Sequence, residues 1–278
     1  MGPSSATELL MRLSPFLVAP LTVLACAAPA SAAGDLLVAP TRVVLDGPRG
    51  TEVFLNNIGN EPATYRVSLE LRRMCPDGRL EEVTAPTPAE QQALAMISYA
   101  PRRVTLPPNQ PQAIRIGVRA AGAVPDGEYR VHMLFRAVPD PKPVTAQAAP
   151  AKGISIALTP IYGVTIPVIV RKGSLSATAA LSNARIVREG GREAIAFDLS
   201  RQGDRSTYGE VRVLKPGEKE PVVLARGIAA YPEIARRTVT LQPRPDFAGT
   251  LAGPVTIQYV EPAEDGGRTI AEAQVVLR

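Results

Sequence analysis

The run from Ile154 to Val170 (ISIALTPIYGVTIPVIV) is the feature that most constrains how this chain folds. Bulky apolar or ring side chains occupy every even position of the run, and most odd positions carry small side chains. Alternation with a period of two places one set of side chains on one face of a β-strand. Fully extended, the run would reach about 55 Å, whereas a typical strand has about 5–6 residues. The strand therefore bends, passes between domains, or offers part of its apolar edge to another molecule.

Short β-rich segments punctuated by Pro and Gly make up most of the remaining chain, which predicts an all-β fold rather than an α/β fold. Their spacing is typical of two immunoglobulin-like β-sandwich domains. One short helix is expected at Thr87–Met96, because Thr87-Pro88-Ala89-Glu90 combines an N-cap, a first-turn Pro and a capping-box Glu. The expected strands before the long run are Leu36–Leu45, Thr51–Asn56, Ala63–Arg72, Ile97–Leu106, Gln112–Arg119 and Glu128–Ala137, and those after it are Leu175–Val187, Glu193–Ser200, Gly209–Leu214, Pro221–Ala230, Arg237–Gln242, Pro254–Val260 and Ile270–Leu277.

The N-terminus has the pattern of a cleaved export signal: a basic residue at Arg12, an apolar stretch at Phe16–Cys26 and small residues at Ala30–Ala32. The apolar stretch is too short to anchor in a membrane, and translation begins at Met1 or Met11. We expect a signal peptide over residues 1–33, an N-terminal domain over 34–172 and a C-terminal sandwich over 173–278, with a Pro/Ala-rich loop at Asp140–Lys152 and the domain junction at Arg171–Ser174.

Few residues in the chain suggest catalysis or metal binding. Its one histidine, His132, lies within an expected strand, and no cluster of His, Cys or carboxylates has metal-ligand spacing. Phosphate-binding loops and the G-x-S-x-G nucleophile motif are also missing. If Cys26 leaves with the signal peptide, Cys75 remains alone in a predicted turn and forms no intramolecular disulfide. We therefore expect an exported non-enzyme with no catalytic residues, metal or cofactor.

The net charge of +5 comes from basic and acidic residues that are interspersed along the chain. A nucleic-acid-binding surface would need clustered basic residues with aromatic partners, and this chain has no Trp and only 4% aromatic residues. No stretch after the signal is apolar enough to span a bilayer. Neither nucleic-acid binding nor membrane insertion is expected.

A series of short motifs resembles the N-terminal domain of the periplasmic pilus-assembly chaperones, the PapD-like family. The matches occur in the same order as in the family, over about 135 residues. Together they are more specific than any single match. The second domain matches only as a β-sandwich of suitable size. The matching segments are Pro40–Gly47, Asn56-Asn57, Tyr65–Leu71, Pro101–Pro108, Gln112–Ile116, Pro125–Arg130 and Ile154–Leu158.

The resemblance implies an L-shaped or boomerang-like pair of sandwiches in the periplasm that folds and caps pilin-like subunits. In that family the chaperone lends a strand to a subunit whose own fold lacks one, and then delivers the subunit to an outer-membrane usher. The lent side chains are matched here by Ile154, Ile156 and Leu158.

The resemblance also implies a basic anchor for the carboxylate at the subunit's C-terminus. Arg42, in the pair Thr41-Arg42, matches the arginine of this anchor, and a guanidinium can bind a carboxylate through two hydrogen bonds. The family's lysine on the long strand has no counterpart, since counting places Gly163 or Tyr162 there. Tyr162 offers a neutral donor, and Arg171 or Lys172 offers a cation from the hinge. Among these matches, Glu128 corresponds to an acidic residue near the domain interface, and we expect it to pair with Arg115 on the preceding strand.

The same residues are also consistent with two other classes of protein. A structural or adhesive two-domain protein of a surface fibre or coat would use Ile154–Val170 as an internal core strand. An exported enzyme is a further option, because scattered carboxylates do not rule out an acid–base pair. In a chaperone with an exposed apolar strand, two free molecules are expected to pair their long strands and form a self-capped homodimer. The subunit itself is not identified by the sequence.

Overall fold

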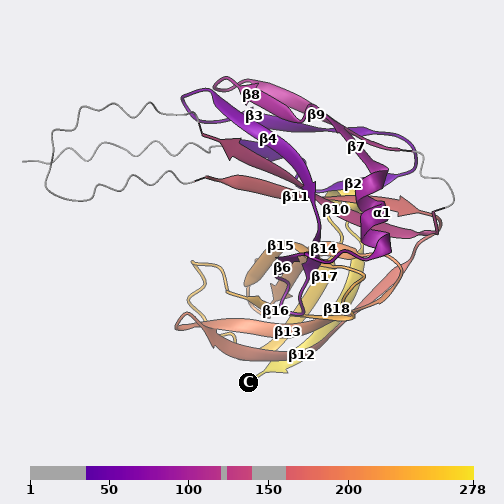
Figure 1. Cartoon of the computed structure of the whole chain (residues 1–278). Helices are drawn as coiled ribbons and strands as arrows, with labels where there is room; N and C mark the ends of the chain where they lie inside the picture. Colours follow the sequence, from indigo (N-terminus) through magenta and orange to yellow (C-terminus); the bar gives the residue numbers. More distant parts are fainter. Residues whose placement is uncertain (1–35, 120–123, 140–160) are drawn as a thin grey trace, which may run out of the picture. The chain divides into compact units, whose positions relative to one another are not determined.

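The computed structural model describes residues 36–119, 124–139 and 161–278 (Figure 1). All of these described residues belong to one compact unit. Almost every element is a β-strand, and the buried apolar side chains form two main cores, one for each of two β-sandwiches. The predicted all-β class with two immunoglobulin-like sandwiches is therefore confirmed. The predicted signal peptide, the Pro/Ala-rich loop and the donor residues Ile154, Ile156 and Leu158 lie outside the described residues.

The first sandwich packs a four-stranded sheet, in the order β1-β3-β9-β7, against a five-stranded sheet in the order β2-β11-β10-β4-β8. All neighbouring strands are antiparallel except β2 and β11, which run parallel. Its elements are β1 (Leu36–Ala39), β2 (Val43–Asp46), β3 (Thr51–Asn57), β4 (Ala63–Glu70), α1 (Pro88–Met96), β7 (Ile97–Ala100), β8 (Arg103–Leu106), β9 (Pro111–Val118), β10 (Gly127–Val138) and β11 (Gly163–Lys172).

Each of two segments that the sequence predicts as a single strand forms two strands, and these two strands belong to different sheets. The segment Leu36–Leu45 divides into β1, which pairs with β3, and β2, which pairs with β11. The segment Ile97–Leu106 divides in the same way into β7 and β8. A proline stands in each gap, Pro40 and Pro101, and proline has no N–H to continue a ladder. The chain crosses from one sheet to the other at these two positions.

The predicted helix is confirmed as α1, with Thr87 as its N-cap. The Glu90 N–H donates to Thr87 Oγ1 at 3.3 Å, and the Thr87 N–H donates to Glu90 Oε2 at 2.7 Å, which completes the capping box. The apolar residues Ala93 and Met96 of α1 are buried in the first core, next to β10 (Figure 1). The helix therefore closes part of the first sandwich.

The described part of the long run forms β11, and its even positions face the first core as the alternation predicts. Ile166, Val168 and Val170 are buried there, and Val164 packs against them. β11 pairs with β10 along its whole length, from Gly163 opposite Arg136 to Lys172 opposite Gly127. Its other edge pairs with β2 only from Val168 to Arg171. Among the described residues, no strand covers that edge of β11 from Gly163 to Pro167.

The second sandwich consists of a three-stranded sheet, in the order β12-β13-β16, and a four-stranded sheet in the order β15-β14-β17-β18. Phe197 and Tyr259 are the largest side chains in its core. Its elements are β12 (Ala177–Glu189), β13 (Arg192–Gly203), β14 (Thr207–Leu214), β15 (Val223–Ala230), β16 (Arg236–Leu241), β17 (Gly253–Val260), the short 3-10 helix η1 (Ala263–Asp265) and β18 (Thr269–Leu277). The division of the chain between residues 172 and 173 stays a prediction.

A hairpin that the sequence did not predict, β5 (Arg72–Met74) with β6 (Leu80–Glu82), extends from the first sandwich to the second. The predicted turn at Cys75–Gly78 is its tip, where the Gly78 N–H donates to Cys75 O at 2.8 Å. The Thr238 N–H of the second sandwich donates to Pro76 O at 2.7 Å. Gly78 has φ +87°, and a Cβ on it would lie 2.3 Å from Arg237 Nε, so this contact requires a glycine.

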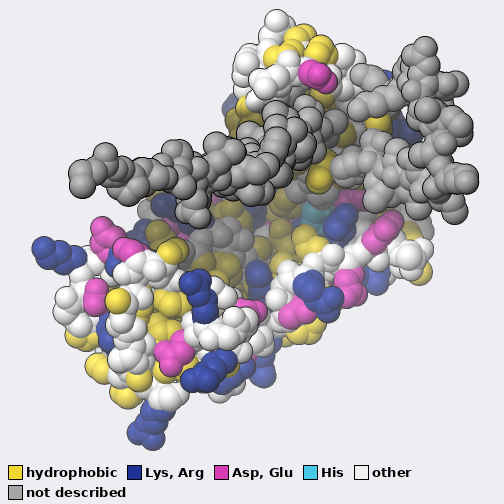
Figure 2. Space-filling view, turned by 90° about the vertical axis from the view of Figure 1, so that its left-hand side faces the viewer, with side chains coloured by type: hydrophobic (Ala, Val, Ile, Leu, Met, Phe, Trp, Pro, Cys, Tyr) yellow, Lys and Arg dark blue, Asp and Glu magenta, His cyan; other side chains and the backbone are white. Residues whose placement is uncertain are grey.

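No helix among the described residues is long and apolar enough to cross a membrane. Lys and Arg side chains on the face in Figure 2 alternate with Asp and Glu and form no basic stripe. This distribution is the one expected from charges that are interspersed in the sequence.

Candidate binding cleft

A cleft of about 550 Å³ lies between the outer face of β2 and β11 and the beginning of β14. The alternation of β2 sends Val43 and Leu45 into the first core, so Arg42 and Val44 face the opposite way, toward the second sandwich. The residues that line the cleft are Arg42, Val44, Asp46, Arg171, Ala177, Thr178, Arg205, Ser206, Thr207, Tyr208, Glu261, Asp265, Arg268, Thr269 and Ile270.

Arg42 is one of the cations that line this cleft. Its guanidinium lies over the ring of Tyr208, 4.4 Å from the ring centre, a geometry typical of a cation–π contact. Burial lowers the pKa of Arg42, Arg171 adds to that effect, and Tyr231 and Glu128 oppose it. The side chain stays protonated because an arginine pKa begins far above neutrality.

The guanidinium edge formed by Nε and Nη2 of Arg42 is buried and has no hydrogen-bond partner among the described residues. The same edge of Arg73 binds Glu90, with Nε to Oε1 and Nη2 to Oε2 both at 2.6 Å. Arg268 binds Glu261 in the same way, at 2.9 and 3.2 Å. A buried charged donor without a partner costs free energy, so the geometry of Arg42 suits an incoming carboxylate.

Glu128 lies where the two sandwiches meet, but its predicted pairing with Arg115 is wrong. Its Oε2 accepts from Arg171 Nε at 3.1 Å, from the Ser206 N–H at 3.0 Å and from Ser206 Oγ at 2.9 Å. Arg115 instead donates to Glu52 at 3.1 Å on the surface. The reason is topological, because Arg115 is in β9 and Glu128 is in β10, which belong to opposite sheets of the first sandwich.

Neither Thr41 nor Tyr162 joins Arg42 in the cleft. Thr41 is exposed, and Tyr162 is 50% exposed just before β11, where its carbonyl accepts from the Ala137 N–H at 3.0 Å. β2 and β11 pair in register from Val43 opposite Val168, so the residue beside Arg42 is Pro167. Gly163 and Tyr162, the two positions matched to the family's lysine by counting, lie four and five residues before Pro167 on the long run. The parallel register therefore places no basic residue of the long strand directly beside Arg42, although Arg171, further along β11, lies near enough to lower its pKa.

Arg171, which the sequence suggested as a substitute cation, does line the cleft. Its charge is already paired, because Glu128 lies 3.1 Å from its Nε and both side chains are largely buried. Lys172 donates to the carbonyl of Val124 and does not line this cleft. Arg171 thus connects the two sandwiches through Glu128 and Ser206 and has less capacity for a further anion.

A second contact region between the sandwiches, centred on Arg130 of β10, was missed by the sequence analysis. Arg130 forms an ion pair with Glu233, lies 3.5 Å from the ring centre of Tyr231 and donates to Arg72 O at 3.0 Å. Ile169 is buried beside Tyr231 in a small apolar cluster. The signal available in the sequence was Ile169 itself, a large apolar residue at an odd position of the alternating run.

His132 is buried in β10 at 1% exposure, and neither ring nitrogen has a hydrogen-bond partner among the described residues. Desolvation lowers its pKa to about 3, and the charges of Arg130 and Arg72 act in the same direction. The imidazole is therefore neutral at physiological pH and does not line the cleft. This placement is typical of a structural histidine.

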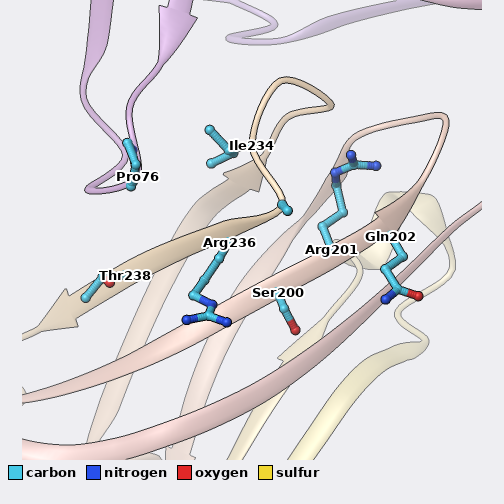
Figure 3. A pocket seen from close by; sticks show the side chains of 8 residues that line it. Pro76, Ser200, Arg201, Gln202, Ile234, Arg236 and Thr238 are labelled. Atoms are coloured by element: carbon cyan, nitrogen blue, oxygen red, sulfur yellow. The ribbon is translucent and has the colours of Figure 1, made fainter.

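A second hollow of about 620 Å³ lies between the hairpin tip at Pro76 and β13 and β16 (Figure 3). Arg201 on its wall is 7% exposed, and its Nη1 and Nη2 donate to the carbonyls of Gly203, Arg205 and Pro232 at 2.8, 3.0 and 3.1 Å. These bonds hold loops of the second sandwich in place. Two arginines, Arg201 and Arg236, line this hollow. Neither has both Nε and Nη2 buried without a hydrogen-bond partner, as Arg42 has.

No family model matches the chain, and no curated protein sequence matches it. The chain is similar to the solved structure of the YadV chaperone, at 15% identity and a TM-score of 0.46, over 88% of this chain and 100% of that one. It is also similar to the Salmonella enterica SafA pilin–SafB chaperone complex (20% identity, TM-score 0.43, 87% and 96% coverage). A third similar structure is the CsuC–CsuE chaperone–tip adhesion subunit complex from Acinetobacter baumannii (11% identity, TM-score 0.43, 88% and 98% coverage).

Proposed function

We propose that this protein is a periplasmic chaperone of pilin-like subunits, which it binds by lending them a strand. The observation that carries the proposal is the edge of β11 from Gly163 to Pro167, along which no strand of the described residues pairs. An uncovered strand edge presents N–H and C=O groups that pair with an added strand. The chain N-terminal to β11 continues the same alternation in sequence, so its apolar side chains are in phase with those that β11 buries.

The apolar side of the run leaves the protein's own core just before β11. Tyr162, which is on the even-numbered side of the run, is 50% exposed, although Ile166 and Val168 on the same side a few residues later are buried. The first sandwich therefore does not bury the apolar side chains at this end of the run. We infer that Ile154, Ile156 and Leu158 enter a subunit's core, where full burial of each contributes about 1.5–3 kcal/mol.

Arg42 is proposed to anchor the carboxylate at the subunit's C-terminus. Its buried, unpartnered guanidinium edge has the geometry that Arg73 and Arg268 use for Glu90 and Glu261. An anchored C-terminus would fix the register in which the subunit meets the lent strand. The function needs no catalytic step. Export through the cleaved signal and delivery to an outer-membrane usher complete the proposal.

The test is the capture of a subunit by the protein purified from its native periplasm. We expect mass spectrometry to identify a pilin-like protein that co-purifies with the wild type and is lost with Ile156→Asp, because a charge cannot enter an apolar groove unpaired. Ala157→Asp is the matched control, since alternation places residue 157 on the opposite face. Circular dichroism should show that both variants are folded.

Two results would contradict the proposal. One is a pilin-like protein that stays bound to Ile156→Asp as well as to the wild type. The other is equal loss with Ala157→Asp, which would indicate that any charge in the segment is disruptive and that no face of it is inserted.

A further inference from the structure

We propose that Arg205, from the second sandwich, supplies the second guanidinium of the carboxylate site that Arg42 begins. This inference rests on the proposed function, because it names a further binding residue of the same cleft. Pro167 stands beside Arg42 on β11, so the long strand provides no cation at that level. Arg205, in the turn before β14, lines the same cleft as Arg42.

The charges that line the cleft divide into paired and unpaired groups. Arg171 is paired with Glu128, and Arg268 is paired with Glu261. Arg42 and Arg205 form no ion pair with any described residue, and Nε of each is buried without a hydrogen-bond partner. These two guanidinium groups are therefore the ones available to an anion.

Arg205 is held in position from both sides along the chain. Before it, Arg201 Nη1 donates to the carbonyls of Gly203 and Arg205 itself, at 2.8 and 3.0 Å. After it, the Ser206 N–H and Oγ both donate to Glu128 of the first sandwich. Fixing the backbone lowers the entropy that a side chain loses when it binds a ligand. The turn between β13 and β14 is thus preorganised to present Arg205 to the cleft.

The acidic residues of the cleft favour a single negative charge over a phosphate. Asp46 and Asp265 are exposed and form no ion pair with Arg42 or Arg205. Asp46, at the end of β2, lies four residues after Arg42, about 13 Å along an extended chain. Both carboxylates would repel a doubly charged group more than a singly charged one. The site therefore suits the terminal carboxylate of a peptide.

The experiment compares two probes, the peptide acetyl-Val-Ala-Val-Tyr with a free C-terminal carboxylate and the same peptide with a C-terminal amide. Affinities for the full mature chain are measured by isothermal titration calorimetry, and the arginine Nε–H signals are followed by NMR. The wild type should prefer the carboxylate by about tenfold or more, as expected for charged hydrogen bonds. Arg205→Ala and Arg42→Ala should each reduce that preference by about tenfold, and Arg205→Lys should restore part of it.

Arg188→Ala is the control, because Arg188 is exposed on β12 and does not line the cleft. A preference that Arg42→Ala removes and Arg205→Ala leaves intact would overturn the role of Arg205. The absence of any carboxylate preference in the wild type, or tighter binding of inorganic phosphate than of the acid peptide, would overturn the carboxylate site. The capture experiment with Ile156→Asp does not depend on these peptides, so failure of the inference and failure of the proposed function are distinguishable.

Discussion

At the scale of single residues, Arg42 and His132 show that burial has different consequences for different basic side chains. Both are basic residues with buried nitrogen atoms that lack hydrogen-bond partners among the described residues. Arginine keeps its charge at every physiological pH, so Arg42 presents a permanent cation to the cleft. Histidine loses its charge when it is desolvated, so His132 is neutral and contributes to packing.

His132 leads to a prediction about stability in acid. Its folded-state pKa of about 3 is below the value of 6.5 in the unfolded chain, so the unfolded state binds a proton first as the pH falls. Stability should therefore decrease by up to about 1.4 kcal/mol per pH unit below pH 6.5. Arg130 and Arg72 oppose protonation, while Glu70, opposite His132 on β4, is the nearby acid in the strand register.

The slope of stability against pH between 6.5 and 4.5, from urea unfolding, is the measurement. His132→Leu should flatten the slope in the upper part of this window, because unfolded Glu90, whose folded-state pKa is lowered to about 2, binds protons only near its ordinary pKa of 4.5 at the lower end. Comparing slopes removes any constant effect of the substitution on packing. An equally steep slope in the variant would show that another group is responsible.

At the scale of elements, local signals predicted α1 and most strands, and failed where a proline lies within an apolar run. The capping box at Thr87 and Glu90 involves residues three positions apart, and the structure has both of its hydrogen bonds. The strands interrupted at Pro40 and Pro101 change sheets, which depends on partners elsewhere in the chain. The hairpin of β5 and β6 was missed because only three residues form each of its strands.

Thr87→Ala should destabilise the first sandwich by about 1 kcal/mol, because it removes the side-chain acceptor of the N-cap. For a chain of this size that loss corresponds to a decrease in Tm of about 2–4 °C. Thr87→Ser keeps the hydroxyl and should leave the Tm nearly unchanged in a calorimetric scan. If serine and alanine lower the Tm equally, the hydroxyl of Thr87 does not stabilise α1.

At the scale of the whole molecule, the buried charge network between Glu128, Arg171 and Ser206 connects the two sandwiches. The Glu128 side chain is 1% exposed and that of Arg171 is 17% exposed. The surface pair of Glu52 and Arg115 is 42% and 84% exposed. Removing one partner leaves an unpaired buried charge in the first case and a hydrated charge in the second.

Glu128→Ala should lower the free energy of unfolding by about 3–5 kcal/mol and speed hydrogen exchange at the Ser206 amide. Glu52→Ala should cost less than about 1 kcal/mol and leave that amide unchanged. Chemical denaturation followed by hydrogen exchange measures both effects. Equal costs for the two variants would mean that the buried network contributes no more than an exposed ion pair.

The sequence by itself determined the all-β class, the single capped helix and the alternation of the long strand, because these depend on residues only a few positions apart. Tertiary structure decided which charges meet. Glu128 bonds to Arg171 and Ser206, 43 and 78 residues away, and Arg42 lies beside Pro167 through the parallel register of β2 and β11. Alternation fixes the face of a strand on which a side chain lies, but only sheet order and register determine its neighbours. The cleft that joins Arg42 and Arg205 is therefore a product of the folded chain.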